Sequence, residues 1–413
     1  MSDASGAERY AEREGRIRNN IALRPTDRVP FTYNPTFWAA RLAGMTYEDI
    51  WYDVDKCIDA TRQAIELLEP DSYSTFTTAF GPTLEALDWQ PMKWPGHGVD
   101  KNATFQYLDA EHMSADEYDN YLADPTRFYL STYLPRVAGA FAAFNKFPAL
   151  PTTTEWSLIK SIRAFADPDL QANLKQLVDA GEKMDAVVKK MNIFIAEMKA
   201  EGFPLNTGAL AQAPYDMFVD FFRGSKSGML DMFRNKDKML AATAKARDFM
   251  LENAIKEARE ADCPYVFIPL HWGLDGFMSL EQFKIFYWPD LRKMIIELIE
   301  HDLTPVMKWE GDCTSRLETI GDIPAGKAIY WFELTDLITA KEIIGDTVCL
   351  RGNVPASILN TATPDDVDDY CKNIINKVGK GGGLILDGAI GVPDEARIEN
   401  VVAMAQSVKK YAF

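Results

Sequence analysis

The sequence between residues 263 and 311 constrains the fold more than any other part of the chain. An apolar run at residues 265–270 is followed by a loop with two glycines, an amphipathic stretch at residues 280–300 and a second apolar run at residues 304–309. Ser279 stands directly before the amphipathic stretch, where a helix N-cap is expected. This order predicts two parallel strands that are joined by a helical crossover.

Both predicted strands end in polar residues. The first ends in His271 and Trp272, and the second ends in Lys308, Trp309 and Glu310. Lys308 and Glu310 share one face, because successive side chains of a strand point to opposite sides. The carboxyl ends of parallel strands meet at one end of a (β/α)8 barrel, where the catalytic groups lie. We therefore expect His271, Lys308 and Glu310 to share one pocket as catalytic residues.

The same alternation of strand-like and helical stretches extends over the chain and predicts the fold class. It favours an α/β protein with a (β/α)8 TIM barrel, whereas a doubly wound open sheet is the alternative. No GxGxxG motif follows the first strand, which favours the barrel. The eight strand candidates lie near Val29, Asp71, Pro204, Val266, Val306, Ile329, Val348 and Leu384.

Residues 80 to about 200 interrupt the alternation. This segment is rich in loops and aromatic residues, and it contains His97 and His112. Long insertions in compact domains are usually functional or disordered, and this one is too aromatic for disorder. We expect a lid-like insertion after the second strand, a flexible tail at residues 1–20 and a single barrel domain at residues 21–413.

Charge and apolar content exclude several kinds of partner. A net charge of −17 argues against a nucleic-acid or anionic membrane surface. The longest apolar runs are far shorter than the roughly 20 residues of a membrane span, and the first 20 residues lack the apolar core of a secretory signal. The five scattered cysteines are typical of reduced thiols. These features predict a cytoplasmic protein with a small-molecule substrate.

The predicted strand ends and nearby loops supply a ring of polar and aromatic side chains around the catalytic candidates. Carboxylates and bases in one cleft shift each other's pKa values and can act as acid or base. Structural roles remain the alternative, such as a buried histidine at 271 or an internal ion pair between residues 308 and 310. The predicted substrate-binding residues are Tyr33, Asn34, Asp71, Gln212, Asp216, Trp272, Glu333, Arg351, Asn353 and Asp387.

Metal binding has less support in the sequence. His271, Glu310, Glu333 and Cys313 have side chains that can bind zinc. The chain contains no C-x-x-C or H-x-C motif, so we expect no tightly bound metal, with zinc as the alternative.

Seven motifs, spread over about residues 15–410, resemble those of one known group of enzymes. The chain is similar to the uroporphyrinogen decarboxylase superfamily, which also contains corrinoid-dependent methyltransferases. The resemblance implies a (β/α)8 barrel, in agreement with the strand count. The motifs are LRPTDRVPF (within 22–31), FPLNTGALAQAPYDMF (203–218), FMSLEQFKIFYWPDLRKMI (277–295), LRGNVPASIL (350–359), TPDDV (363–367), GKGGGLIL (379–386) and ARIENVVAM (396–404).

The chain departs from the decarboxylases of this superfamily in its first loop. Those enzymes follow the first strand with an arginine-rich segment of the type MRQAGRY, which holds the substrate carboxylates. The matching stretch here is TYNPTFWAARLAGM at residues 32–45, with Arg41 alone. The resemblance therefore favours an activity other than porphyrinogen decarboxylation.

The chain also departs from the zinc-dependent methyltransferases of the superfamily. Lys308 and Glu310 stand where those enzymes have the His and Cys of an H-x-C motif, and Ala389 stands where they have a later Cys. The resemblance then implies a methyltransferase or demethylase that moves a methyl group between a small-molecule donor, such as an ether or amine, and a corrinoid on a partner protein. A tetrapyrrole carboxy-lyase and a non-catalytic ligand-binding barrel are the alternatives, and a homodimer is expected from the family.

Overall fold

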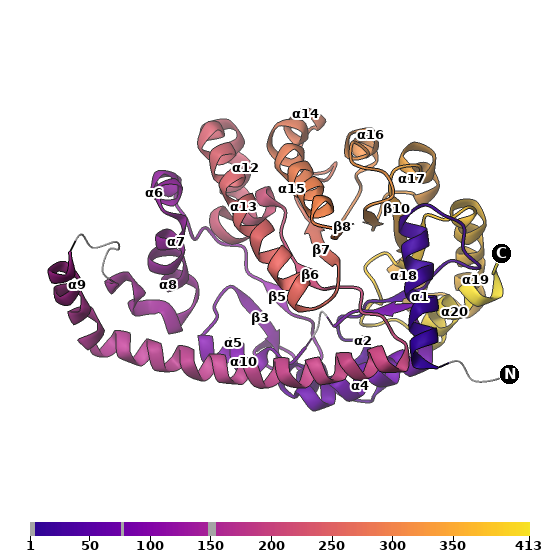
Figure 1. Cartoon of the computed structure of the whole chain (residues 1–413), viewed down its shortest axis with the longest axis horizontal. Helices are drawn as coiled ribbons and strands as arrows, with labels where there is room; N and C mark the ends of the chain where they lie inside the picture. Colours follow the sequence, from indigo (N-terminus) through magenta and orange to yellow (C-terminus); the bar gives the residue numbers. More distant parts are fainter. Residues whose placement is uncertain (1–4, 76–77, 148–153) are drawn as a thin grey trace.

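Parallel strands form the centre of the molecule, and helices pack around them (Figure 1). The structure is a computed structural model that describes residues 5–75, 78–147 and 154–413. Six strands form one sheet in the spatial order β11-β10-β9-β8-β7-β6, with every neighbouring pair parallel. They are β6 (Ala209–Leu210), β7 (Tyr265–Leu270), β8 (Thr304–Trp309), β9 (Ile329–Phe332), β10 (Cys349–Val354) and β11 (Leu384–Gly388).

A second, two-stranded sheet contacts both edges of the six-stranded sheet. Its parallel strands are β1 (Thr32–Tyr33) and β2 (Ser72–Tyr73). One isolated parallel bridge joins Phe31 to Leu386 of β11, and another joins Tyr73 to Leu205, just before β6. The α/β class is thereby confirmed, and parallel segments lie at the predicted positions. The sheets are not continuous through these single bridges, so closure into a barrel stays a prediction.

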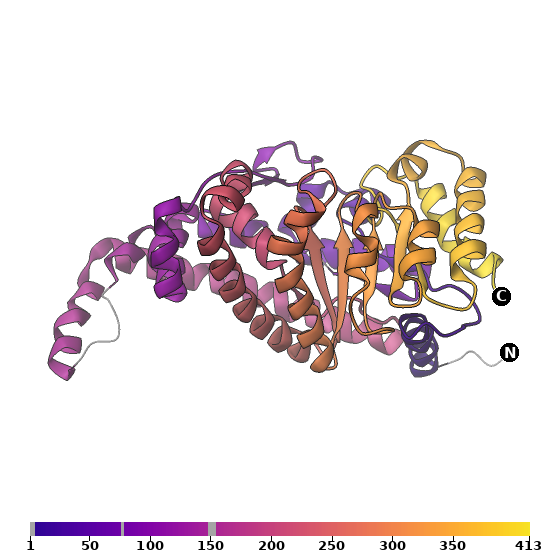
Figure 2. The ribbon, with the colours of Figure 1, turned by 90° about the horizontal axis from the view of Figure 1, so that it is seen from above.

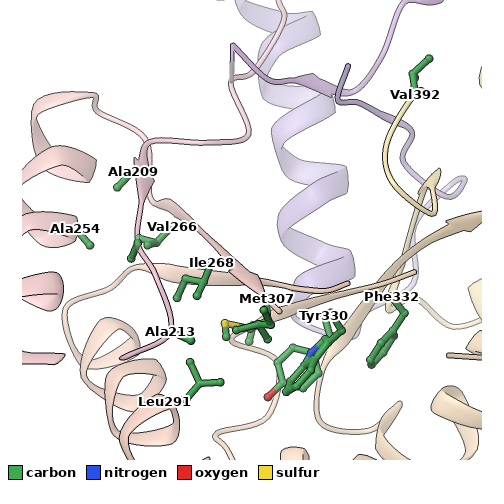
Figure 3. Packing of buried hydrophobic residues seen from close by; sticks show 14 of the residues in the cluster. Ala209, Ala213, Ala254, Val266, Ile268, Leu291, Met307, Tyr330, Phe332 and Val392 are labelled. Carbon is green, nitrogen blue, oxygen red and sulfur yellow. The ribbon is translucent and has the colours of Figure 1, made fainter. Parts of the chain in front are cut away.

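The predicted period-two alternation decides which side chains enter the core. Val266 and Ile268 of β7 and Met307 of β8 are fully buried, and they pack in the apolar layer with Leu291 (Figure 3). Lys308, which follows Met307 in β8, faces the opposite side and lines a cavity. One side of the strands therefore meets the helices, and the other side is available for a site.

Helix α15 (Trp288–Glu300) shows how the outer helices are fixed. Its buried residues include Leu291, Met294, Ile295 and Leu298, which form a stripe at helical spacing. Ser279 caps the preceding turn by accepting the backbone N–H of Gln282, as the sequence predicts. The other outer helices are α2 (Trp38–Leu42), α3 (Tyr47–Tyr52), α4 (Val54–Leu68), α12 (Gly224–Arg234), α13 (Lys236–Glu260), α14 (Leu280–Gln282), α16 (Leu317–Ile320), α17 (Leu337–Ile344), α18 (Ala356–Thr361), α19 (Pro364–Ile374) and α20 (Ile398–Lys410).

Helix α1 (Gly6–Ile21) covers the amino ends of the strands. Its apolar face packs on side chains at the strand starts, including Tyr265. The side-chain oxygen of Asn20 accepts two backbone N–H groups where β11 begins, at 3.1 and 3.3 Å. The flexible tail expected at residues 1–20 is therefore wrong for the described part of it, because a helix with these contacts is ordered. Residues 1–4 lie outside the described residues.

A buried ion-pair network joins α1 to the start of β2. Arg16 contacts Asp71 at 2.6 Å and Asp27 at 2.7 Å, and Arg28 contacts Asp71 at 2.7 Å. The Asp71 side chain is 1% exposed, and Glu12 binds Arg16 from the solvent side. The substrate-binding role predicted for Asp71 is wrong, because Asp71 precedes its strand and lies at the amino ends of the strands, opposite the carboxyl ends.

The insertion after β2 has two parts. Its short strands and first helices lie near the strand ends, whereas α10 (Pro168–Glu201) extends for about 51 Å and carries α9 away from the strands (Figures 1 and 2). No helix among the described residues combines the length and apolar composition of a membrane span. The other elements of the insertion are α5 (Gly81–Leu87), β3 (Met92–Pro95), β4 (Gly98–Val99), β5 (Gln106–Tyr107), α6 (Tyr118–Ala123), α7 (Pro125–Phe128), α8 (Leu134–Val137) and α9 (Glu155–Ser161).

Replacing Arg16 by alanine should destabilise the protein by about 3 kcal/mol, because Asp71 keeps only one of its two cations in a buried position. Urea-induced unfolding, followed by circular dichroism, measures this loss. Glu12→Gln is the matched control, because it removes an exposed partner of the same arginine and should cost less than about 0.5 kcal/mol. Equal losses in the two variants would contradict a structural role for the Arg16–Asp71 pair.

Candidate functional site

A cavity of about 640 Å³ lies at the carboxyl ends of the strands. The structure brings the three predicted catalytic residues together in its wall, because they follow or end the neighbouring strands β7 and β8. Their catalytic role stays a prediction. The predicted site residues that line the cavity are Asn34, Gln212, His271, Trp272, Lys308 and Glu310.

Aromatic side chains form much of the remaining wall, and sequence reasoning missed them as site residues. Phe267 and Trp331 lie at inward-facing strand positions, so alternation with their buried neighbours is a signal that could have found them. No comparable pattern marks the aromatic residues of the insertion. The insertion thus contributes to the cavity wall, while its action as a lid stays a prediction. The insertion residues involved include Trp89, Phe105, Tyr107 and Tyr133.

Asp220, which the sequence analysis also missed, holds two rings of the cavity wall. One carboxylate oxygen lies 2.7 Å from Nδ1 of His271, and the other accepts the indole N–H of Trp272 at 2.6 Å. Asp220 lies in the π-helical segment η5 (Phe218–Arg223). Its only signal in the sequence is its spacing of four from the predicted residue Asp216, which places both on one helical face.

Asp216 lies beneath the same two residues and is fully buried. Its carboxylate accepts the backbone N–H of His271 at 2.8 Å, the backbone N–H of Trp272 at 3.3 Å and the hydroxyl of Tyr287 at 2.7 Å. Burial raises the pKa of the Asp216 carboxyl, and the charge of His271 opposes this rise. The structure therefore corrects its predicted role: Asp216 supports the end of β7 and does not line the cavity.

A row of charged groups crosses the wall from β7 to β8. Nε2 of His271 lies 3.5 Å from one carboxylate oxygen of Glu310, and Nζ of Lys308 lies 3.1 Å from the other. Lys308 also lies 4.8 Å from the ring centroid of Trp331. Each cation of this row therefore has a carboxylate partner: Asp220 for His271 and Glu310 for Lys308.

The contacts of His271 favour its protonated form. Burial alone lowers the pKa of the imidazole, but the hydrogen bond to Asp220 and the charges of Asp216, Asp220 and Glu310 raise it to about 9. With Nδ1 directed at Asp220, Nε2 is the ring nitrogen that can donate a proton to a molecule in the cavity. The site can therefore act as a general acid at neutral pH.

Arg351 and Asp387 form a second buried pair behind the Trp331 ring. Nε and Nη2 of Arg351 donate to one oxygen of Asp387 at 2.9 and 2.8 Å, and Asn34 donates to the same oxygen at 3.2 Å. The Arg351 guanidinium lies 3.9 Å from the Trp331 ring centroid. Complete burial raises the pKa of Asp387 to about 6, although Arg351 lowers it. Both predicted substrate-binding residues are thus enclosed, and they support Asn34 and Trp331.

Three further predicted substrate-binding residues do not line the cavity. Tyr33 is fully buried against Trp38, with ring centroids 6.0 Å apart. Asn353 is buried and donates to the backbone oxygen of Thr335. Glu333 is half-buried, and burial raises its pKa. The structure corrects the predicted contacts of Tyr33 and Asn353 with substrate, because protein encloses both side chains.

Among the residues with zinc-binding chemistry, His271 and Glu310 lie 3.5 Å apart, whereas Cys313 is not part of the cavity lining. Cys313 is buried and lies 3.3 Å from the hydroxyl of Thr335. Across residues 5–75, 78–147 and 154–413, no three His, Cys, Asp or Glu side chains lie as a metal site requires.

Comparisons with known proteins place this site in a family context. A family model described as uroporphyrinogen decarboxylase (URO-D) matches residues 154–411. The uroporphyrinogen decarboxylase of Coxiella burnetii is 30% identical over 79 residues, which are 19% of this chain and 22% of the relative. That of Dichelobacter nodosus is 26% identical over 190 residues, 45% of this chain and 51% of the relative. The chain therefore spans about half or less of the curated relatives that it matches.

A solved structure extends the similarity over the whole fold. A methyltransferase from Methanosarcina mazei has a TM-score of 0.62 and 14% sequence identity, and the alignment covers 99% of both chains. At this identity the likeness concerns the fold.

NMR titration of histidine side chains should give a midpoint near pH 9 for His271, because Asp220 and Glu310 favour the imidazolium. A pKa raised from 6.5 means that these contacts stabilise the fold fully below pH 6.5 and that the contribution is lost as the pH rises through about 9. The difference in melting temperature between the protein and His271→Gln should therefore be larger at pH 6 than at pH 10. A His271 midpoint near 6.5 would contradict this arrangement.

Proposed function

The chain belongs to the uroporphyrinogen decarboxylase family, and on that premise we propose that it is a methyltransferase or demethylase that moves a methyl group between a small-molecule donor and a corrinoid protein. One observation carries the proposal. His271, whose contacts with Asp220 and Glu310 favour the imidazolium, lies at the wall of an aromatic cavity in which Lys308 already has a carboxylate partner. The methyltransferase title of the structural neighbour gives further support.

The proposed chemistry needs an acid more than a cation-rich pocket. The bond between the methyl carbon and the donor heteroatom breaks, its electron pair stays on the heteroatom, and the methyl group moves to the reduced corrinoid of the partner protein. Nε2 of His271 gives its proton to the heteroatom, so that an alcohol or amine leaves. Glu310, 3.5 Å from Nε2, supports the imidazolium before transfer, and Lys308 holds Glu310 in place.

The architecture fits this use of the site. We propose that the eight parallel segments act as one closed (β/α)8 barrel within a single domain at residues 21–413, with the insertion as a lid over its mouth. The single bridges at both edges of the six-stranded sheet support closure. The aromatic residues that the insertion contributes to the cavity wall support the lid.

Decarboxylation of a porphyrinogen is the second candidate, and the names of the family model and of the curated relatives favour it. The charges of the cavity argue against it. A substrate with many carboxylates requires several unpaired cations, but no arginine is among the described cavity-lining residues, and Lys308 is paired with Glu310.

A methyl-transfer assay separates the candidates. The purified protein is mixed with a reduced corrinoid protein and a panel of methyl ethers and methylamines, and methylation of the corrinoid is followed by absorbance. A second arm incubates the protein with uroporphyrinogen and counts product carboxylates by chromatography. Corrinoid methylation supports the proposal, loss of carboxylates supports the second candidate, and binding without turnover in either arm indicates a non-catalytic barrel. Elemental analysis of the same sample shows whether zinc takes part.

Lys308→Met and Glu310→Gln should each lower kcat about 100-fold. Glu310→Gln removes a charge that favours the His271 imidazolium, and Lys308→Met removes the contact that holds Glu310 in place. Steady-state methyl transfer measures the change. Lys341→Met is the matched control, since Lys341 contacts the backbone oxygen of Gly382 before β11 begins and should leave kcat unchanged. Full activity in both site variants would remove Lys308 and Glu310 from the mechanism.

A further inference from the structure

Two carboxylates on one helical segment converge on two consecutive residues of the cavity wall. Asp216 lies in α11 (Pro214–Met217) and Asp220 lies one turn later in η5. Both contact His271 and Trp272, which follow β7 directly. No other pair of described carboxylates holds the same two residues in this way.

The two carboxylates divide the contacts between backbone and side chains. Asp216 accepts both backbone N–H groups, at 2.8 and 3.3 Å, whereas Asp220 contacts both rings, at 2.7 and 2.6 Å. The Tyr287 hydroxyl donates to Asp216 from the neighbouring helical segment. Backbone and rings are thus fixed independently, which limits the rotation of His271 and Trp272 more than either carboxylate could alone.

We infer that Asp220 is a positioning residue that orients the His271 and Trp272 rings toward the cavity, and that Asp216 positions the backbone that carries them. The inference rests on the proposed function only for the reaction that His271 serves. It assigns to Asp220 both the direction of the proton donor and the position of an aromatic wall.

The surroundings of His271 explain why a carboxylate is needed at Nδ1. Glu310 faces Nε2 from the end of β8, at 3.5 Å, which is too long for a strong hydrogen bond. Lys308 faces Glu310 and competes for it. Asp216 lies below the ring but bonds the backbone of His271. Asp220 is therefore the group that makes a short contact with the imidazole, and a carboxylate at Nδ1 fixes the ring orientation and leaves Nε2 for substrate.

The Trp272 contact gives Asp220 a second function. The indole N–H of Trp272 donates to Asp220 at 2.6 Å, and the Trp272 ring packs on Phe277 with centroids 4.8 Å apart. Trp272 lines the cavity, so the orientation of its ring affects the space that is left for a substrate. Loss of Asp220 should therefore affect both proton donation and substrate binding, whereas a purely structural ion pair would affect stability alone.

Asp220→Asn is the test, because it keeps the size of the side chain and removes its charge. The NMR midpoint of His271 should fall by about two pH units toward its ordinary value, which lowers the protonated fraction at pH 8 about tenfold. The rate of methyl transfer should then fall more at pH 8 than at pH 6. Trp272→Phe should raise KM without lowering the His271 midpoint, because it leaves the contact between Asp220 and His271 intact.

Asp109→Asn is the matched control. Asp109 also lines the cavity, but it binds Ser225, so its loss should leave the His271 midpoint unchanged. An unchanged midpoint in Asp220→Asn, or an equal fall in Asp109→Asn, would overturn the inference. The NMR measurement needs no substrate. Absence of methyl-transfer activity would therefore refute the proposed function, while the His271 midpoint would still test the role of Asp220. Tyr287→Phe removes one donor to Asp216, so it should lower the His271 midpoint slightly, and a rise would contradict the electrostatic contribution of Asp216 to His271.

Discussion

A carboxylate that is removed from water needs hydrogen-bond donors or a cation, and this requirement organises both ends of the strand assembly. At the base, Asp71 is satisfied by two arginines and fixes helix α1 to the start of β2. Behind the cavity, Asp387 is satisfied by Arg351. At the cavity wall, Asp216 is satisfied by backbone N–H groups and a tyrosine. The same need thus supports the scaffold at one end and shapes the site at the other.

Much of the fold follows from local patterns in the sequence, because period-two alternation marks strands that are covered by helices. His271, Lys308 and Glu310 could be placed together for the same reason: carboxyl ends of neighbouring parallel strands meet. Asp220 could not, since it reaches the site from a helical segment and its role depends on tertiary contact. Asp71 was misplaced because the sequence does not fix where this short strand begins and ends, and Asp71 directly precedes it.

The part of the chain that matches the family model contains the central strands of the scaffold. The family match covers residues 154–411, which include the six-stranded sheet. Within that frame, the cavity-facing position of Lys308 is separate from the packing, because its neighbours Met307 and Trp309 belong to the buried core. A fold of this kind can exchange the charge of its pocket while the apolar layer stays the same.

Helix α1 has a consequence for the order in which molecules can occupy the cavity. It covers the amino ends of the strands, and the apolar cluster that includes Ile17 and Tyr265 fills the space above it. In the described part of the structure, molecules therefore enter and leave the cavity through its mouth at the carboxyl ends of the strands. Under the proposed function, the small-molecule donor would therefore have to enter before the corrinoid protein covers the mouth. A helix that covers the base thereby also constrains the order in which molecules bind.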